Sequence, residues 1–493
     1  MIRIASLAPI LPAVWAFVLL AGCGRHDDGQ PIEVGVIGPA IGQTHGNADR
    51  GQLGALAAAL IGATGQGLVR FDAAGQIVPG LAARWIVTDG GRSVIFRLPD
   101  LPDPSARPIE TEAIAHRIRT AIAADSRNRL KPLLGAIDEV DAVTPQVIDI
   151  ELKAPRPNIL QLFAQPDLAM GEPGHGPFRI VAARNGTALL RPLPDRDTDP
   201  DDEARSPPAV RLHGQSAGRA VAWFAAGRSD LVLGGRFSDL PVARAAQLPR
   251  GALRFDPAKG LFGLAFLRAG AGFVAEPDNR RALAMAVDRD RIGTMLNLPG
   301  WSPTAAIVAP GTPEIEQPVI PPWAAPSLAD RQAHARALIG KWQATHGPPP
   351  VLRVAMPPGP GARLLFASIA RDWRAIGVQA VAVEIGGPAD LRLIDEVAPA
   401  DVASFYLRAF ACDRQVICTD VTDRLLIEAR EADSLAERKV LLMQADALMA
   451  DTVPFVAFGE PVRWSLVAPT LDLYRDSPRA IHPLNELRTP LMR

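Results

Sequence analysis

Residues 64–98 constrain the fold of this chain more than any other stretch. They read TGQGLVRFDAAGQIVPGLAARWIVTDGGRSVIFRL. Three short apolar runs, at residues 68–71, 77–87 and 94–98, are separated by two turn sequences, Asp-Ala-Ala-Gly and Asp-Gly-Gly. Apolar runs of this length, bounded by Asp and Gly, are typical of strands joined by tight turns. The stretch therefore predicts a small antiparallel unit of three strands.

The length and the charge of the chain limit its number of domains and its partners. With 493 residues, it is longer than one hydrophobic core normally serves, and about three domain-sized units are expected. Its formal net charge is −1 and it has no run of Lys or Arg. Because phosphate binding requires a basic surface, nucleic acid is excluded as a partner. Aromatic residues make up only 5% of the chain, which limits ligand recognition by stacking.

The first 23 residues have the character of a targeting segment. Arg3 precedes an apolar run at residues 4–22, which ends in Leu-Ala-Gly before Cys23. This ending resembles a bacterial lipobox, in which small residues admit the signal peptidase and the cysteine thiol takes up the lipid. We expect residues 1–23 to be a lipoprotein signal peptide, and the exported protein to be held on the periplasmic or cell-envelope side of a bacterial membrane. The alternative is a plain membrane anchor, since the run is just long enough to span.

Four later segments carry patterns that are specific in combination. They are GHGPFRI at residues 174–180, GRSDLV at 227–232, NRRALAMAVDR at 279–289 and VPF at 453–455. The third places Leu283, Ala286 and Val287 on one face of a predicted helix. Between the third and fourth segments, a strand at 351–355 and a helix at 364–376 precede a further strand, and this βαβ pattern predicts a parallel sheet.

Together with residues 64–98, these segments resemble the family 5 extracellular solute-binding proteins, which are the dipeptide, oligopeptide and nickel receptors of ABC importers. The family signature "LV.yd..G.ivPgLA..W" is matched from Leu68 to Trp85, and "vRqAlayAiDR" is matched at residues 279–289. The resemblance extends, with gaps, to about Phe458. Residues 38–49 depart from it, because they lack the family's usual "sLdP" segment.

The resemblance implies an α/β fold of the type II periplasmic-binding-protein kind, with two lobes and an accessory α+β domain. Lobe I is expected to be discontinuous and to comprise residues 30–63, 178–258 and 459–493. The accessory domain II is expected at residues 64–177 and lobe III at residues 259–458. The implied mechanism is hinge closure of the two lobes over a bound solute.

The function implied by the resemblance is that of a receptor of an ABC importer. It would bind a peptide or another small polar solute and deliver it to the permease subunits of the transporter, as a monomer and without an enzymatic step. No cofactor is expected. The sequence has no CxxC, HExxH, P-loop or Rossmann fingerprint, and its eight dispersed histidines do not indicate a metal site. Use of the same fold as a non-transport scaffold is an open alternative, because the pocket segments are altered.

The resemblance also assigns a ligand site to the segment that reads RAFACDR from residue 408. It takes the place of the family's "GW.aDy", whose Asp pairs with the N-terminal ammonium of a peptide. Asp413 is thereby a candidate ligand residue, together with Arg408, Phe410 in place of Trp, and Arg414 in place of Tyr. Such a charge-assisted bond requires a cleft that excludes water. A solvated Asp413, or one paired with Arg414, is an equal alternative.

Cys412 and Cys418 are the only cysteines that remain if Cys23 carries lipid. Because exported proteins meet oxidising conditions, we expect these two cysteines to form a disulfide. Closing so short a loop would contribute roughly 2 kcal/mol in the chain-entropy description. Two free buried thiols are the alternative.

One enzyme motif occurs, a GxSxG centred on Ser216. A strand is predicted before it and a helix after it, which is the context of a nucleophile elbow, and His482 follows later in the chain as the hydrolase order requires. No HGGG-type oxyanion loop is present. A lipid-anchored serine hydrolase is therefore the second alternative function.

Overall fold

A computed structural model describes residues 30–38, 47–99, 109–170, 175–184, 186–193, 208–268 and 272–487. Residues 31–493 form one compact unit. The predicted signal peptide, with Cys23, lies outside the described residues. Within the described ranges, no helix combines the length and the apolar character needed to cross a bilayer.

The largest sheet has seven strands in the order β12-β18-β11-β1-β10-β9-β8. Its strands are β1 (Ile32–Ile37), β8 (Phe178–Arg184), β9 (Thr187–Pro192), β10 (Val210–Gln215), β11 (Leu231–Arg236), β12 (Leu253–Phe255) and β18 (Arg463–Val467). The central β1 pairs in parallel with β10 and β11, and the other pairs are antiparallel. Helices α1 (Ala55–Thr64) and α5 (Ala217–Ala225) both contact β1 and β11, and α6 (Leu240–Ala245) packs against α5.

The second large sheet has five strands in the order β15-β14-β16-β13-β17. Its strands are β13 (Gly260–Phe266), β14 (Leu352–Met356), β15 (Ala380–Glu384), β16 (Leu391–Val397) and β17 (Phe455–Gly459). Strands β14 and β15 pair in parallel on either side of α11 (Pro360–Arg374). The βαβ unit predicted from the sequence is therefore confirmed.

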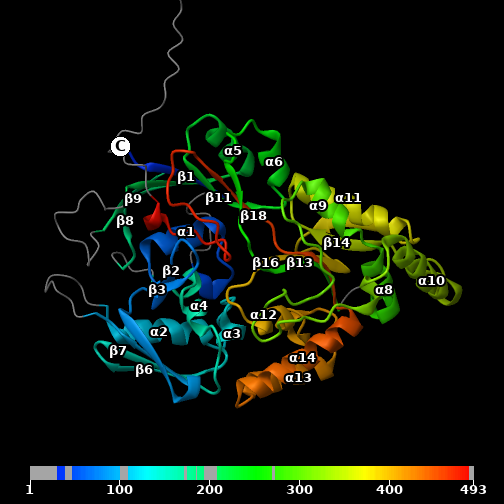
Figure 1. Cartoon of the computed structure of the whole chain (residues 1–493), viewed down its shortest axis with the longest axis horizontal. Coiled ribbons are helices and arrows are strands. Elements are labelled where there is room, and N and C mark those ends of the chain that lie inside the picture. The colour runs from blue at the N-terminus through cyan, green and yellow to red at the C-terminus, as the bar shows by residue number, and fades with distance from the viewer. Residues whose placement is uncertain are drawn as a thin grey trace, which may run out of the picture. The chain divides into compact units, whose positions relative to one another are not determined.

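Helices cover both faces of this second sheet (Figure 1). One group is α7 (Gly272–Ala275), α8 (Pro277–Ala286), α9 (Arg289–Leu296), α10 (Leu328–His346) and α11, and the other is α12 (Ala403–Arg408), α13 (Asp420–Glu431) and α14 (Leu435–Thr452). Every residue of β13 is buried. Phe262 and Leu264 join the hydrophobic cluster of the first group, whereas Leu261 and Ala265 join that of the second. The continuous apolar run of β13 thus follows from burial on both faces.

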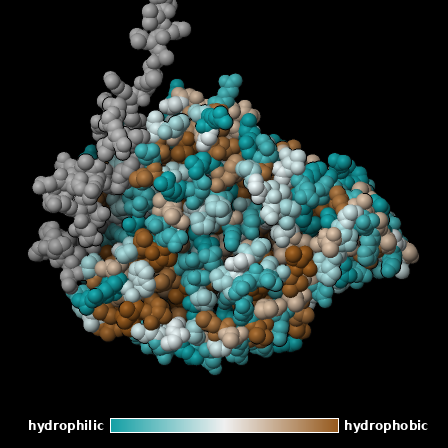
Figure 2. Space-filling view, in the orientation of Figure 1, coloured by the Kyte–Doolittle hydropathy of each residue, from teal (hydrophilic) through white to brown (hydrophobic). Residues whose placement is uncertain are grey.

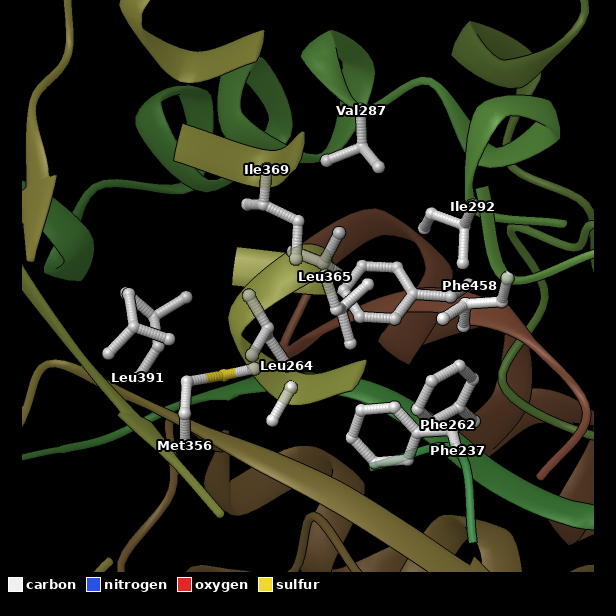
Figure 3. Packing of buried hydrophobic residues seen from close by; sticks show 14 of the residues in the cluster. Phe237, Phe262, Leu264, Val287, Ile292, Met356, Leu365, Ile369, Leu391 and Phe458 are labelled. Carbon is white, nitrogen blue, oxygen red and sulfur yellow. The ribbon is translucent and has the colours of Figure 1, made fainter. Parts of the chain in front are cut away.

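The main hydrophobic core joins the two large sheets (Figure 3). Leu365 and Ile369 of α11 lie over Leu264 of β13, and the rings of Phe237 and Phe262 lie side by side. Phe237 directly follows β11 of the seven-stranded sheet, and its ring centroid is 4.9 Å from that of Phe262 in the five-stranded sheet. Aromatic contacts of this kind stabilise the packing beyond the area that they bury.

The stretch at residues 64–98 forms two separate hairpins instead of one three-stranded unit. Strand β2 (Val69–Phe71) pairs with β3 (Ile77–Pro79), and β4 (Arg84–Thr88) pairs with β5 (Ser93–Arg97). The second hairpin belongs to a four-stranded sheet that is completed by β6 (Ile137–Thr144) and β7 (Val147–Leu152). The prediction of a single unit was wrong because the middle apolar run is divided between β3 and β4.

Helix α2 (Thr111–Ile122) packs on the four-stranded sheet, and α3 (Lys131–Leu134) and α4 (Ile159–Phe163) lie beside it. Figure 2 shows hydrophobic residues gathered on the face of the molecule where this sheet and α2 lie in Figure 1. Ile86 and Val87 of β4 and Val143 of β6 are among its exposed side chains.

Candidate functional site

A cavity of about 250 Å³ lies where the two large sheets approach each other. It is lined by the carboxyl ends of β11 and β16, the first residues of β18, helix α1, and residues 479–485. Because β18 runs antiparallel to β11, its beginning lies beside the end of β11. Crevices at the carboxyl ends of parallel strands are the usual ligand sites of open α/β sheets.

Two arginines and one aspartate form a charged wall of this cavity. Nη1 of Arg463 donates to Oδ1 of Asp395 at 2.7 Å, and Nη2 donates to the carbonyl oxygen of Asp395 at 3.0 Å. Nη1 of Arg236 lies 3.9 Å from the second carboxylate oxygen of Asp395, and 47% of its side chain is exposed. Burial, followed by the charge of Arg463, lowers the pKa of Arg236. Arg463 is therefore held tightly, whereas Arg236 has the guanidinium that is available to a ligand.

A second polar wall is built around His482. Its Nε2 lies 3.2 Å from Oδ2 of Asp256 and 3.4 Å from the hydroxyl oxygen of Tyr474, and its ring stacks on that of Tyr474. Oδ1 of Asp256 accepts the backbone N–H of Ser477 at 2.8 Å. Burial raises the pKa of Tyr474, and the charge of Asp256 adds to this effect, so the phenol stays protonated and can donate.

The remaining charged groups of the cavity differ in how fully they are paired. Arg129 forms a two-pronged ion pair with Asp167, with both N···O distances 3.0 Å, and Arg70 pairs with Glu486 at 3.0 Å. Glu396 is exposed, and its carboxylate forms no hydrogen bond or ion pair with any residue that the structure describes. The cavity thus presents a loosely paired cation, Arg236, and a free anion, Glu396.

This arrangement suits the binding of a polar solute. Arg236 can donate two parallel hydrogen bonds to a carboxylate, and Glu396 can accept hydrogen bonds from an ammonium group. Phe71 and Trp464 add apolar lining, as is usual in small-molecule sites. Across the described ranges, no group of three or more His, Cys, Asp or Glu side chains could hold a metal ion.

The sequence profile described as "Bacterial extracellular solute-binding proteins, family 5 Middle" matches residues 76–392, which is more than half of the chain. This protein belongs to that family. Family 5 solute-binding proteins are non-enzymatic components of ABC transporters, and the present member is a solute-binding receptor. A comparison with the curated proteins found no match.

Solved structures of solute-binding proteins share the fold of this family 5 member. The Escherichia coli murein tripeptide binding protein MppA has a TM-score of 0.77 at 17% identity, covering 94% of this chain and 99% of that one. Haemophilus influenzae OppA in complex with RPPGFSPFR has a TM-score of 0.78 at 15% identity, covering 94% and 100%. NikZ of Campylobacter jejuni in complex with Ni(L-His) has a TM-score of 0.72 at 16% identity, covering 93% and 99%. The predicted family and α/β periplasmic-binding fold are confirmed.

The four ligand residues predicted from the sequence lie away from this cavity. Asp413 lies on a 3-10 helix, Cys412–Arg414, where 66% of its side chain is exposed and one carboxylate oxygen is 3.9 Å from Nε of Arg414. Phe410 is buried against Phe455. Arg408 lines a different and smaller cavity. None of the four lines the large cavity, and their role in binding cargo stays a prediction from the resemblance.

Two acidic residues that line the large cavity and that were not singled out from the sequence are Asp395 and Glu396 at the end of β16. They occur in a strand that ends at the edge of a sheet, whereas Asp413 follows a helix, α12. The signal that could have found them is a short strand-like run with Leu391, Leu393 and Ile394 that is followed directly by two acids.

The disulfide and the serine motif have clear positions. Cys412 and Cys418 are joined, with an S–S distance of 2.05 Å. Ser216 is the N-cap of α5 after β10, so the strand and the helix lie where they were predicted. Its backbone, however, has φ −65° and ψ 153°, an ordinary extended conformation and not the strained turn of a nucleophile elbow. His482 bonds to Asp256 and Tyr474. Nothing in this arrangement favours a hydrolase.

Proposed function

We propose that this family 5 receptor captures a small zwitterionic solute, such as a short peptide, in the cavity between its two large sheets and delivers it to the permease of an ABC importer. The observation that carries the proposal is that one cavity is lined both by Arg236, which has only a 3.9 Å contact with Asp395, and by the exposed Glu396. A guanidinium and a carboxylate that lack close partners suit a ligand with a carboxylate and an ammonium group.

The size of the cavity narrows the cargo. About 250 Å³ lies just below the range of about 300–1,000 Å³ that is usual for small-molecule pockets. Haemophilus influenzae OppA was solved with the nine-residue peptide RPPGFSPFR. Such a ligand exceeds the present cavity, so we propose cargo of one to a few residues.

The proposed mechanism is hinge closure. Lobe I is proposed at residues 30–63, 178–258 and 459–493, lobe III at 259–458, and the accessory domain at 64–177. The chain crosses between the two large sheets at residues 256–259, after β12, and at residues 460–462, between β17 and β18. Because so few segments connect the two sheets, one lobe can rotate against the other around a bound solute.

The location that we propose is a bacterial membrane, on its periplasmic or cell-envelope side. Export through the signal peptide and lipidation of Cys23 would place a monomeric receptor next to its permease. Mass spectrometry of the purified full-length protein tests this, because a diacylglyceryl group on Cys23 adds a defined mass to the N-terminal peptide.

A thermal-shift screen of dipeptides, tripeptides, amino acids and opines tests the capture of cargo. A true ligand stabilises the folded protein by mass action, and small-angle scattering should show a more compact particle with the same ligand. Absence of stabilisation by every zwitterionic solute, with stabilisation by a sugar or a metal alone, would contradict the proposal.

A matched pair of glycine variants tests whether the cavity itself is the site. Gly62 of α1 lines the cavity, and a side chain at this position would meet nothing within 4 Å. Gly340 of α10 is equally open but does not line the cavity. We expect Gly62→Phe to weaken ligand binding at least tenfold while the protein stays folded, and Gly340→Phe to leave binding unchanged. Equal binding by both variants would place the site elsewhere.

Two further substitutions separate this site from the one predicted at Asp413. Arg236→Gln should weaken the binding of a solute carboxylate about tenfold or more, since a hydrogen bond to a charged group is lost. Asp413→Ala should have no effect if the cavity is the site. Loss of binding in the Asp413 variant alone, measured by calorimetry, would favour the predicted site over the cavity.

A further inference from the structure

A second cavity, of about 30 Å³, lies between α3 and α4 on one side and α12, α13 and α14 on the other. We call it the arginine cavity, because its polar lining consists of Ser404 and four arginines. These are Arg156, Arg408, Arg430 and Arg438. The rest of the lining is apolar and includes Leu133, Ile159 and Leu442.

Two of these arginines have carboxylate partners. Nε of the buried Arg438 donates to Oε1 of Glu314 at 2.5 Å, and Nη1 donates to the carbonyl oxygen of Ala429 at 2.8 Å. The other oxygen of Glu314 accepts the backbone N–H of Ala403 at 2.8 Å, so this carboxylate is fully used. Arg430 reaches Glu431 at 3.3 Å on the exposed side.

The other two arginines have no bonded carboxylate among the described residues. Arg156 donates from Nη1 to the carbonyl oxygen of Pro155 at 2.7 Å and from Nη2 to that of Arg430. Arg408 has a buried Nε without a hydrogen-bond partner in the part of the chain that the structure describes. A buried donor that lacks a partner costs free energy, and an absent water or ion is a common reason for one.

The charges of these groups oppose one another. Burial, followed by the charges of Arg438 and Arg430, lowers the pKa of Arg156 to about 10, and the charge of Glu314 offsets this only in part. Burial is also the main cause of the lowered pKa of Arg408, which Asp413 and Asp423 only partly offset. The cavity therefore carries a surplus of positive charge in a place with little water.

The size and the donors of the cavity define what can neutralise this charge. One water needs about 10–15 Å³ of such volume, so 30 Å³ admits a small ion but not a peptide. Guanidinium groups present planar pairs of N–H donors, which match the oxygens of phosphate and sulfate.

We propose that the arginine cavity is a binding site for one small inorganic oxyanion, phosphate or sulfate, bridging Arg156 and Arg408. The ion supplies an acceptor for the buried Nε of Arg408 and the negative charge that Arg156 lacks. It also links the segment of α3 and α4 to α12 and α13. The two segments are already tied by Asn158, whose side-chain amide donates to the carbonyl oxygen of Asp401 at 2.9 Å, and by Arg156, which donates to the carbonyl oxygen of Arg430. The site is separate from the cargo cavity and does not depend on the nature of the cargo.

The test is calorimetric titration of the whole protein with sulfate and, in parallel, with phosphate, at an ionic strength held constant with chloride. We expect binding of one ion per chain and a rise of the unfolding temperature with sulfate concentration. Arg408→Gln should weaken sulfate binding about tenfold or more. Arg424→Gln removes an exposed arginine of α13 that does not line the cavity and should bind sulfate as the wild type does.

A second variant and a crystal soak test the site independently of Arg408→Gln. Arg156→Gln serves if Arg408→Gln does not fold, and selenate soaked into a crystal should give anomalous density between Arg156 and Arg408. Three outcomes would overturn the proposal: no heat beyond the chloride control, sulfate binding unchanged in both arginine variants, or selenate only in the large cavity. Gly62→Phe, which fills the cargo cavity, should leave sulfate binding intact.

Discussion

Gly176 lies at the point where the chain re-enters the seven-stranded sheet, directly against the end of α1. Its backbone N–H donates to the carbonyl oxygen of Thr64 at 3.1 Å, and an added Cβ would lie 2.4 Å from the carbonyl carbon of Thr64. Since side chains do not approach a backbone so closely, Gly176→Ala must displace one of the two segments. We expect a loss of about 1–3 kcal/mol of unfolding free energy, the usual cost of overpacking, measured by urea denaturation.

Gly218 is the matched control for this substitution. It lies inside α5, within the GxSxG motif, and a Cβ there would meet nothing within 4 Å. Gly218→Ala should therefore stabilise the protein by about 0.5–1 kcal/mol, because alanine has less backbone freedom to lose in a helix. Similar losses of unfolding free energy in both variants would mean that the close approach at Gly176 does not explain the effect.

At the scale of single residues, the structure gives a physical reason for one predicted motif, whereas the predicted ligand site at Asp413 stays a prediction. Gly176 belongs to the segment GHGPFRI quoted above from the sequence, and its close contact with Thr64 gives a physical reason for a glycine there. The ligand site was assigned to Asp413 from a short sequence motif, whereas the large cavity is lined by Asp395 and Glu396. A motif that contains Gly is constrained by local geometry, but a cavity depends on side chains from distant parts of the chain.

At the scale of elements, α14 contains a buried acid with an unusual proton affinity. Asp446 is 1% exposed, and Oδ2 accepts the backbone N–H of Val319 at 2.8 Å. Burial raises the pKa of Asp446 from 3.8 to about 6, although the hydrogen bond from Val319 lowers it in part. The folded protein thus keeps this proton to a higher pH than the unfolded chain does. Stability should therefore fall as the pH rises from about 4 to 6, and stay reduced above that range.

Asp446→Asn tests this effect, because the amide oxygen can still accept the N–H of Val319 but carries no charge. We expect the variant to be more stable than the wild type by about 1–3 kcal/mol at pH 7 and equal to it near pH 4. Asp451→Asn, which changes an exposed acid on the same helix, should have little effect at either pH. Denaturant unfolding at the two pH values measures both. A difference that does not depend on pH would contradict the assignment.

The elements themselves were predicted unevenly. The helical face predicted for Leu283, Ala286 and Val287 holds for the first two, but Val287 is the C-cap of α8, which ends at Ala286, and α9 starts at Arg289. Asp288 causes the break: its side chain accepts the N–H of Arg291 at 3.1 Å and caps the new helix. Helical periodicity continues across such a break, so the apolar pattern alone does not reveal it. The parallel β14–α11–β15 unit, which has clear boundaries, was predicted correctly.

For the whole molecule, the order of the segments was more informative than any one of them. The family and its α/β fold followed from segments spread between residues 64 and 458, matched in sequence. The large cavity could not be predicted in the same way, because its lining runs from Val36 to Asn485. Side chains so far apart in the sequence come into contact only when both large sheets have formed, and no local sequence pattern predicts that contact.

The ion pair between Arg463 and Asp395 joins the two large sheets at the cavity wall, since Arg463 begins β18 and Asp395 lies in β16. Their side chains are only 9% and 8% exposed. Asp395→Asn would leave two arginines, Arg463 and Arg236, facing each other without a carboxylate between them. We expect the unfolding free energy to fall by about 3 kcal/mol, as is usual when one partner of a buried pair is removed.

Asp413→Asn is the matched control, because Asp413 also lies beside an arginine, Arg414, but with 66% of its side chain exposed. An exposed pair contributes about 0–1 kcal/mol, so this variant should unfold almost as the wild type does in guanidinium chloride. The Asp395 variant should in addition bind cargo more weakly, because the geometry of Arg236 depends on the same carboxylate. If Asp413→Asn lowered the unfolding free energy more than Asp395→Asn does, the ion pair between the two sheets would not be a main contribution to stability.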